Sequence, residues 1–350
     1  MSLRLILACS SLITLAACGA PDPAPADRPA NASPATTQRP LLTTDQIETG
    51  ALRPTAPPTT PPVEGAPPPA YAPDAGMVRL QILLDRSRFS PGVIDGLGGE
   101  NTRQAIAAWR KANDLGEGGA ADGELLQQLA AADATPVMSR YVLTAADVAG
   151  PFSPLPGADL AETARAGTHY STALERLAER FHVTEALLQG LNPGVDFRRA
   201  GQTIVVPAVN DTPLTGVARI VVDKTERSAR AFNAAGTLLA FYPATIGSSE
   251  RPAPSGVVTV VGVAPEPNYT YDPDRVSYDR GDARVVVPAG PNNPVGTVWI
   301  DLSRDTYGIH GSPDPSKIGK TASNGCVRLT NWDAEQLAAG VKPGVVVRFI

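Results

Sequence analysis

Short apolar runs, rich in β-branched residues, recur along the C-terminal part of the chain. Clusters of Gly, Pro, Asn and Asp separate them, a pattern typical of many short strands. The runs cover residues 218–222, 229–232, 238–242, 257–263, 284–287, 298–302, 327–329 and 345–350. One helix is expected between Thr330, a capping residue, and Gly340, a stop signal. The pattern predicts a mainly β domain over residues 216–350, a barrel or sandwich with one or two short helices.

Helical patterns dominate the residues before this domain. Apolar positions recur at helical spacing from Val78 to Leu84, from Asn101 or Thr102 to Ala112, and from Asp122 to Ala131. They predict a three-helix module over residues 76–135.

Residues 139–208 predict a second module, of mixed α and β structure. Two helices are expected, from Thr172 to Phe181 and from Glu185 to Leu191. A turn with the sequence Asn-Pro-Gly follows, and then a short strand that ends at Pro207. We therefore expect small α-helical and α+β modules in front of the β domain.

The segment 18–75 has a different composition. It holds 15 of the chain's 35 prolines and a single aromatic residue, Tyr71. Such a segment buries too little apolar surface to offset the entropy of ordering it. We predict a disordered tether that is semi-extended where proline is dense.

The first 17 residues have the pattern of a bacterial targeting signal. Arg4 precedes an apolar run that ends at Ala17 and is too short to span a bilayer. The sequence Leu-Ala-Ala-Cys-Gly around Cys18 resembles a lipobox, in which Cys18 is lipidated and becomes the first mature residue. A plain secretory signal is the alternative. Gly19 favours the outer membrane of a Gram-negative cell, so we expect a lipid anchor on its periplasmic face.

The net charge and the hydropathy of the chain limit the classes of partner that it can bind. The formal net charge is -5, whereas binding of nucleic acid requires a basic surface. No long apolar run follows the first twenty residues, so we expect no membrane-spanning helix. We predict no nucleic-acid partner, and contact with a membrane through the lipid anchor alone.

Cysteine usage points to chemistry and not to disulfide bonds. Of three cysteines, Cys9 leaves with the signal and Cys18 carries lipid, so Cys326 has no partner for an internal disulfide. In the strand that follows, alternation places Cys326 and Arg328 on one face and the apolar Val327 on the other. This geometry favours a thiol that faces a cleft.

A base and a positive charge are available to such a thiol. The thiolate is the attacking form and is a minority species near neutral pH. His310, sixteen residues before Cys326, is the candidate base. Arg328 either lowers the pKa of the thiol or binds a substrate carboxylate. Gly325 leaves room for a carbonyl group, and backbone N–H groups from Asn324 to Cys326 are candidate donors to an oxyanion.

The group that orients the imidazole stays open at this point. The carbonyl of Gly311 and the hydroxyls of Ser312 and Ser323 are all candidates. A zinc ion would need more ligands than Cys326 and His310 provide, and the other two histidines lie in a different segment. We expect no metal and no organic cofactor.

These residues resemble the signature of YkuD-type L,D-transpeptidase domains, which is His-Gly, a short gap, and Ser-His-Gly-Cys-(Ile/Val)-Arg. The chain has His310-Gly311 and then Ser-Asn-Gly-Cys-Val-Arg from Ser323, and the resemblance covers residues 217–350. It implies that Cys326 is the nucleophile and His310 its base, with Arg328 and Tyr307 in substrate binding.

The chain departs from this signature at one position. Asn324 stands where the family most often has a second histidine. An amide side chain cannot transfer protons, but it can donate a hydrogen bond, so a part in binding the oxyanion survives.

The two N-terminal modules also resemble known domains. Residues 76–135 resemble a three-helix peptidoglycan-binding domain, on the turn Asp95-Gly96 and the helix around Trp109. Residues 139–208 resemble the second half of a LysM module, on the helix pair, the Asn-Pro turn and the final strand.

The resemblance to L,D-transpeptidases implies an acyl transfer on peptidoglycan. A tetrapeptide stem would be the donor and would form a thioester with Cys326. The acceptor would be a diaminopimelate amine, which gives a 3→3 crosslink, or a lysine of an outer-membrane protein. The alternatives are hydrolysis of the same bonds by an L,D-carboxypeptidase or amidase, and a non-catalytic lipoprotein that binds the cell wall.

Overall fold

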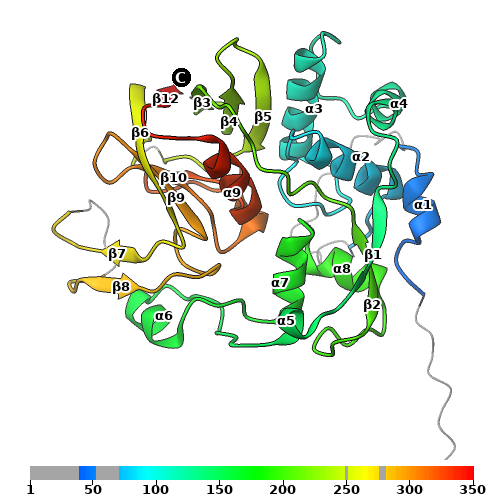
Figure 1. The fold of residues 1–350 in the computed structure, drawn as a ribbon, viewed down its shortest axis with the longest axis horizontal. Coiled ribbons are helices and arrows are strands. Elements are labelled where there is room, and N and C mark those ends of the chain that lie inside the picture. Colours follow the sequence, from blue (N-terminus) through cyan, green and yellow to red (C-terminus); the bar gives the residue numbers. More distant parts are fainter. Residues whose placement is uncertain (1–38, 53–70, 249–250, 276–280) are drawn as a thin grey trace, which may run out of the picture. The chain divides into compact units, whose positions relative to one another are not determined.

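The computed structural model describes residues 39–52, 71–248, 251–275 and 281–350 (Figure 1). The targeting signal and the proposed lipidation site, Cys18, lie outside the described residues, and so does much of the proline-rich segment.

The C-terminal domain is built on one mixed sheet of eight strands, in the order β11-β10-β9-β6-β12-β3-β4-β5. Parallel pairs are β10 with β11 and β12 with β3, and the other neighbours are antiparallel. The strands are β3 Arg219–Asp223, β4 Ser228–Phe232, β5 Leu238–Pro243, β6 Gly256–Pro265, β9 Val298–Leu302, β10 Gly308–His310, β11 Val327–Arg328 and β12 Val346–Phe349.

The sheet curls until its two ends meet. Thr245, just beyond β5, and Arg328 of β11 exchange two backbone hydrogen bonds of 2.9 Å. This closure gives the barrel-like, mainly β domain that the spacing of apolar runs predicts, so that prediction is confirmed. It also fixes the short strand β11, which has only two residues and directly follows Cys326.

Apolar side chains fill the inside of the curled sheet. Ile220, Val222, Ile300 and Val347 are fully buried there. Helix α9, Asn331–Gly340, covers this core with Ala334 and Leu337. Thr330 caps the helix by accepting a hydrogen bond of 3.2 Å from the N–H of Asp333, as the sequence predicts.

A hairpin extends from the sheet domain. It consists of β7, Tyr269–Tyr271, and β8, Val285–Val287, which pair antiparallel. Helix α6, Leu160–Ala166, packs on it: Leu160, Tyr271 and Val287 form a small separate core (Figure 1).

One hydrophobic core extends through both of the regions before the sheet domain in which the sequence predicts separate modules. The core joins residues of α2, α3, α4, β1, α7, α8 and β2, and one residue of the sheet domain, Phe241. Strands β1 and β2 pair antiparallel, and α3 begins at Glu100, slightly before the predicted start. The bounds are α2 Ala75–Arg86, α3 Glu100–Ala112, α4 Gly123–Ala132, β1 Met138–Val142, α5 Ala145–Val148, α7 Ala173–Arg180, α8 Glu185–Leu191 and β2 Thr203–Pro207.

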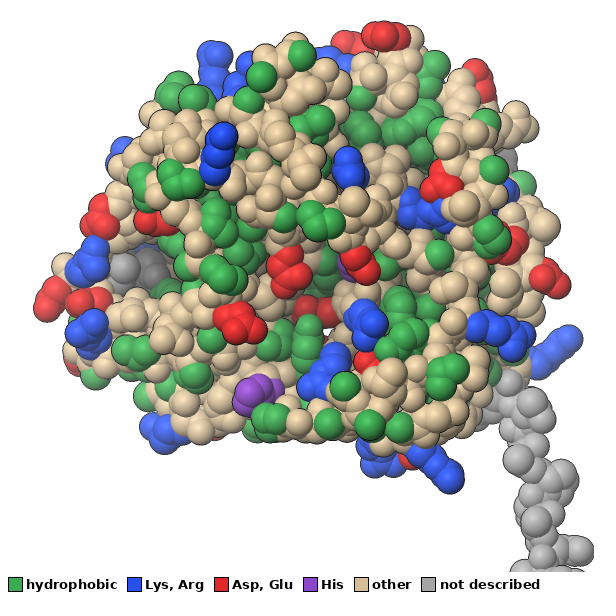
Figure 2. All heavy atoms as spheres, viewed as in Figure 1, with side chains coloured by type: hydrophobic (Ala, Val, Ile, Leu, Met, Phe, Trp, Pro, Cys, Tyr) green, Lys and Arg blue, Asp and Glu red, His purple; other side chains and the backbone are tan. Residues whose placement is uncertain are grey.

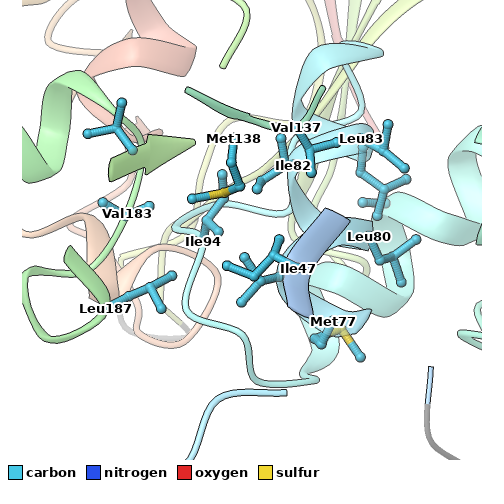
Figure 3. Packing of buried hydrophobic residues seen from close by; sticks show 14 of the residues in the cluster. Ile47, Met77, Leu80, Ile82, Leu83, Ile94, Val137, Met138, Val183 and Leu187 are labelled. Atoms are coloured by element: carbon cyan, nitrogen blue, oxygen red, sulfur yellow. The ribbon is translucent and has the colours of Figure 1, made fainter. Parts of the chain in front are cut away.

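The prediction that the whole of 18–75 is a disordered tether is wrong for residues 39–52. They contain helix α1, Thr44–Glu48, which Thr43 and Gln46 stabilise with a capping box. Ile47 is fully buried among Leu80, Ile94 and other core residues (Figure 3). The carboxylate of Glu48 accepts hydrogen bonds from two backbone N–H groups at the start of β1. A few residues with specific contacts order this stretch. The average composition of segment 18–75 did not indicate them.

Acidic and basic side chains are interspersed over the face of the molecule shown in Figure 2. Within the described ranges, no helix has the length and apolar character needed to cross a membrane.

Candidate active site

Neighbouring strands bring Cys326 and His310 to one place. His310 is the last residue of β10, and in the parallel pairing of β10 with β11 it lies opposite Arg328. Val327 and Leu329 are buried in the core, with 1% and 0% exposure, so Cys326 and Arg328 point to the opposite face. Both of these side chains, with His310, line a cavity of about 640 Å³.

The ring of His310 is buried and held from two sides. Its Nδ1 lies 2.7 Å from the carbonyl oxygen of Gly311. A carbonyl only accepts hydrogen bonds, so Nδ1 carries the proton and Nε2 keeps the lone pair of a base. Trp299 stacks on the ring, with 5.3 Å between ring centroids. Of the three groups that sequence leaves open as the orienting partner, the structure places the carbonyl of Gly311 on the imidazole.

Electrostatics keep this imidazole neutral. Burial lowers the pKa of His310 to about 3, with a further contribution from the positive charge of Arg328. The carbonyl groups of Gly311 and Val295 oppose the shift only in part. At physiological pH the imidazole is therefore in its neutral form, the form in which Nε2 can accept a proton.

The thiol of Cys326 is also in its neutral form. Burial raises the pKa of Cys326, against the opposing effects of the backbone at Gly308 and of the Arg328 charge. The Sγ atom lies 3.6 Å from the carbonyl oxygen of Thr306, which accepts a hydrogen bond from the thiol. The resting pair is therefore thiol and imidazole, so attack by the sulfur of Cys326 requires transfer of its proton.

The turn before Cys326 is shaped by close contacts. Gly325 has φ +106°, and a Cβ at this position would lie 2.7 Å from the ring of Tyr307. The hydroxyl of Ser323 accepts a hydrogen bond from the N–H of Gly325 at 3.2 Å and donates one to the carbonyl of Cys326 at 2.5 Å. Only glycine fits here, because Tyr307 closes over the turn.

Asn324, the residue that departs from the signature, is held by a loop. Its Oδ1 accepts a hydrogen bond of 2.9 Å from Nη1 of Arg251. This contact orients the side chain at the rim of the cavity, where Asn324 is one of the lining residues. Arg251 thereby adds a positive charge beside the cavity.

Charged side chains of both signs line the rest of the cavity. Arg275 and Arg284 come from the β7–β8 hairpin, and Asp272 and Asp305 face the same space. Arg275 pairs with Asp305 at 3.0 Å. Such a mixed lining suits a ligand that carries both carboxylate and ammonium groups.

Sequence reasoning missed several residues of this site. Trp299, Thr306 and Arg251 contact the ring, the thiol and Asn324 respectively. In the predicted strand 298–302, Trp299 alternates with apolar residues and so faces away from the core. That position was the one sequence signal for a role in the site. Thr306 and Arg251 lie in loops, and no local pattern marks their approach. Within the described ranges, no group of three or more His, Cys, Asp or Glu side chains is arranged to hold a metal ion.

The curled sheet defines a domain of mainly β structure, and its cavity is the candidate active site. Residues 217–348 match the YkuD family, the L,D-transpeptidase catalytic domain. A putative L,D-transpeptidase YkuD of Bacillus licheniformis is 32% identical over 176 residues, which cover 50% of this chain and 91% of the relative. The chain belongs to the L,D-transpeptidase family.

Other relatives are more distant or cover less of their own length. A probable L,D-transpeptidase ErfK/SrfK of Escherichia coli strain K12 is 31% identical over 188 residues, covering 52% of this chain and 60% of the relative. Among solved structures, L,D-transpeptidase 3 of Mycobacterium tuberculosis, in complex with a faropenem-derived adduct, aligns over 43% of this chain and 74% of its own. Its identity is 18% and the TM-score 0.32, which is too low to bear on the site.

Proposed function

We propose that this protein is a cysteine-dependent L,D-transpeptidase that acts on the tetrapeptide stems of peptidoglycan. The observation that carries the proposal is that Cys326 and His310 line one cavity in a chain of this family. The family relation supports the reaction class, and the geometry supports the roles of the individual residues.

The first half-reaction forms a thioester. Nε2 of His310 accepts the proton of the Cys326 thiol as the sulfur attacks the carbonyl carbon of the third stem residue. Because the N–H of Gly325 already donates to Ser323, we assign the stabilisation of the oxyanion to the backbone N–H of Cys326. The bond to the terminal D-Ala then breaks. Its nitrogen takes the proton from His310, and D-Ala leaves with a free amine.

The second half-reaction transfers the acyl group. An acceptor amine attacks the thioester carbonyl and loses a proton to His310, and the thiol of Cys326 is restored when that proton returns to sulfur. We propose the side-chain amine of a diaminopimelate residue, which gives a 3→3 crosslink, or a lysine of an outer-membrane protein. Asp272 and Asp305 would face the amine, while Arg328 and Tyr307 would contact the donor stem.

The experiment is mass spectrometry of the purified protein incubated with disaccharide-tetrapeptide, beside the Cys326→Ala variant. We expect release of D-Ala and a 3→3 dimer, both absent in the variant. D-Ala with only a tripeptide product would favour hydrolysis. Unchanged tetrapeptide, with no mass shift on Cys326, would reject the tetrapeptide as donor.

We further propose that Cys18 is lipidated and anchors the protein at the periplasmic face of the outer membrane. The lipobox-like sequence around Cys18 supports this assignment. Metabolic labelling with an alkyne fatty acid should modify the wild-type protein and not the Cys18→Ala variant. Equal labelling of both proteins would exclude this anchor.

The two N-terminal modules are proposed to help hold the enzyme to the cell wall. The resemblance of residues 76–135 to a peptidoglycan-binding domain and of residues 139–208 to a LysM module supports this. Sedimentation of the Cys326→Ala variant with purified sacculi tests it. A protein that stays entirely in the supernatant would contradict wall binding.

A further inference from the structure

A buried carboxyl group from the N-terminal region reaches the helix that follows the catalytic cysteine. Glu179, near the end of α7, has 7% exposure. Its Oε2 accepts a hydrogen bond of 2.9 Å from Nδ2 of Asn331, the first residue of α9. The other oxygen of Glu179, Oε1, is buried and has no hydrogen-bond partner among the residues that the structure describes.

The side-chain amide of Asn331 also forms hydrogen bonds with the backbone around His310. Its Nδ2 also donates to the carbonyl of Pro291 at 3.2 Å. Its Oδ1 accepts from the N–H of Ser312 at 3.1 Å and from the N–H of Thr297 at 3.3 Å. All of these contacts depend on one orientation of the amide, with nitrogen toward Glu179 and oxygen toward the backbone.

The backbone held by Asn331 is the segment that orients the catalytic ring. Gly311 lies so close that a Cβ on it would be 2.2 Å from Oδ1 of Asn331. The carbonyl of the same Gly311 fixes the proton on Nδ1 of His310. A displacement of Asn331 therefore moves the peptide that holds the imidazole, and small displacements of reacting groups are costly to the rate.

We propose that Glu179 is a positioning residue for His310, which acts through Asn331 and the peptide of Gly311. This inference rests on the proposed function, because it assigns His310 as the base. It makes the N-terminal region a part of the catalytic machinery, in addition to any binding to the wall.

Packing alone does not account for a carboxyl group at this position. An apolar side chain of similar volume would leave no buried oxygen unpaired, and unpaired buried polar atoms are costly. An acceptor at position 179 acts together with the carbonyl of Pro291 to hold the amide of Asn331 in the orientation that the backbone of Ser312 requires.

The charge state of Glu179 supplies a readout. Burial raises its pKa to about 8, against the hydrogen bond from Asn331. The acidic side chains that face it are Glu175 from its own helix, Glu335 from α9 and Asp314 from the loop after β10, and all three raise the pKa further. Glu179 is thus a neutral acid at pH 7 and ionises near pH 8.

The test compares Glu179→Gln and Glu179→Leu with the wild-type protein. Glutamine keeps an acceptor without a charge, so we expect kcat at pH 7 within about twofold of the wild type, and loss of the ionisation near pH 8 from the pH profile. Leucine leaves Asn331 without this acceptor. We expect kcat to fall about tenfold with KM little changed, since the change affects the reacting group and not the binding of the stem.

The matched control is Glu175→Gln, at a buried glutamate one turn earlier on α7. Its carboxylate bonds to the hydroxyl of Ser171, whereas the amide nitrogen of Asn331 bonds to Glu179 and Pro291. We expect this variant to keep the wild-type kcat. Thermal unfolding of all variants shows which of them fold, and an equal loss of kcat in Glu175→Gln and Glu179→Leu would overturn the proposal.

A second readout does not depend on the substrate. Alkylation of Cys326 by iodoacetamide is followed on the tryptic peptide 321–328, which separates it from the other cysteines. We expect Glu179→Leu to slow alkylation several-fold at pH 7 and Glu179→Gln to leave the rate unchanged. A folded Glu179→Leu variant with wild-type alkylation at every pH would refute the role of Glu179. If the wild type releases no D-Ala, the proposed function fails, and alkylation still decides the role of Glu179.

Discussion

Burial sets the properties of the individual residues in this site. It lowers the pKa of His310 to about 3 and raises the pKa of the Cys326 thiol, so both groups are neutral at rest. A neutral pair avoids the cost of burying two charges. In the proposed mechanism the proton moves as the sulfur attacks the carbonyl carbon of the donor, which would confine the reactive thiolate to the complex with substrate.

Gly325 gives a prediction at this scale. Replacement by Ala would force a Cβ into the ring of Tyr307, 2.7 Å away, at φ +106°. We expect at least a tenfold loss of kcat/KM and a loss of about 1–3 kcal/mol in the free energy of unfolding. Steady-state kinetics and chemical denaturation measure the two effects.

Gly344→Ala is the control for Gly325→Ala. Gly344 also has a positive φ, +92°, but no atom lies within 4 Å of the added Cβ. It should lose stability through backbone strain alone and keep its activity. Equal activity of both variants would contradict the role assigned to the contact with Tyr307.

The core of the site was predictable from sequence, and its surroundings were not. Cys326, His310 and Arg328 follow from a short motif and from strand alternation, which are both local. Trp299 reaches the ring of His310 through the antiparallel register of β9 and β10. Arg251 reaches Asn324 from a loop far along the chain. Such contacts depend on pairing between distant segments, which one sequence without relatives does not specify.

At the scale of elements, strong local signals gave strands and helices in the right places. The runs of β-branched residues correspond to β3 through β6, β8, β9, β11 and β12, and the capping signal at Thr330 to α9. Strands β1 and β7 were missed, and β7 has only three residues. Helices α5 and α6 were also missed, because they are short and carry little apolar periodicity. Helices of this length depend on tertiary contacts for their stability.

Helix α1 gives the prediction at this scale. It has five residues and is too short to form in isolation. Ile47 is its buried anchor, with 0% exposure. We expect Ile47→Ala to lower the free energy of unfolding by about 2–5 kcal/mol, measured by urea denaturation.

Leu41→Ala is the matched control for Ile47→Ala, because Leu41 lies in the same segment and is 50% exposed. It should change stability by less than about 1 kcal/mol. Equal, small effects at both positions would show that residues 39–52 do not pack on the protein in solution.

At the scale of the whole molecule, the N-terminal region and the sheet domain form a continuous structure. Phe241 of β5 is buried in the N-terminal core, and its backbone bonds to that of Arg88 and Ser90. Polar contacts extend the junction. The hydroxyl of Ser90 donates to Asp333 at 2.9 Å, and the ring of His182 stacks on Trp332 at 4.8 Å.

This junction contains two groups that titrate abnormally in the same direction. Burial raises the pKa of Asp333 to about 7, and the nearby Asp85 raises it further. Burial alone would lower the pKa of His182, but Asp85, 2.9 Å from its Nδ1, raises it. In each case the folded state binds its proton more tightly than the unfolded state. The stability that these groups contribute is present at low pH and is lost as pH rises through the raised values.

We therefore expect the free energy of unfolding to fall as pH rises, for Asp333 between its ordinary pKa of 3.8 and its folded value of about 7, and for His182 above its ordinary value of 6.5. Asp333→Asn should remove the part of the fall that lies below about pH 7. The amide cannot ionise, so the variant should be more stable than the wild type at pH 8, on the order of 1 kcal/mol. Urea denaturation at several pH values measures the slope. Asp211→Asn is the control, because it also removes an acidic group near His182. The side chain of Asp211 is 76% exposed, so this variant should leave the slope almost unchanged. If Asp333→Asn keeps the wild-type slope, Asp333 is ionised in the folded protein. Protonated His182, beside the carboxylates of Asp85 and Asp333, would then be the cation that stabilises that charge.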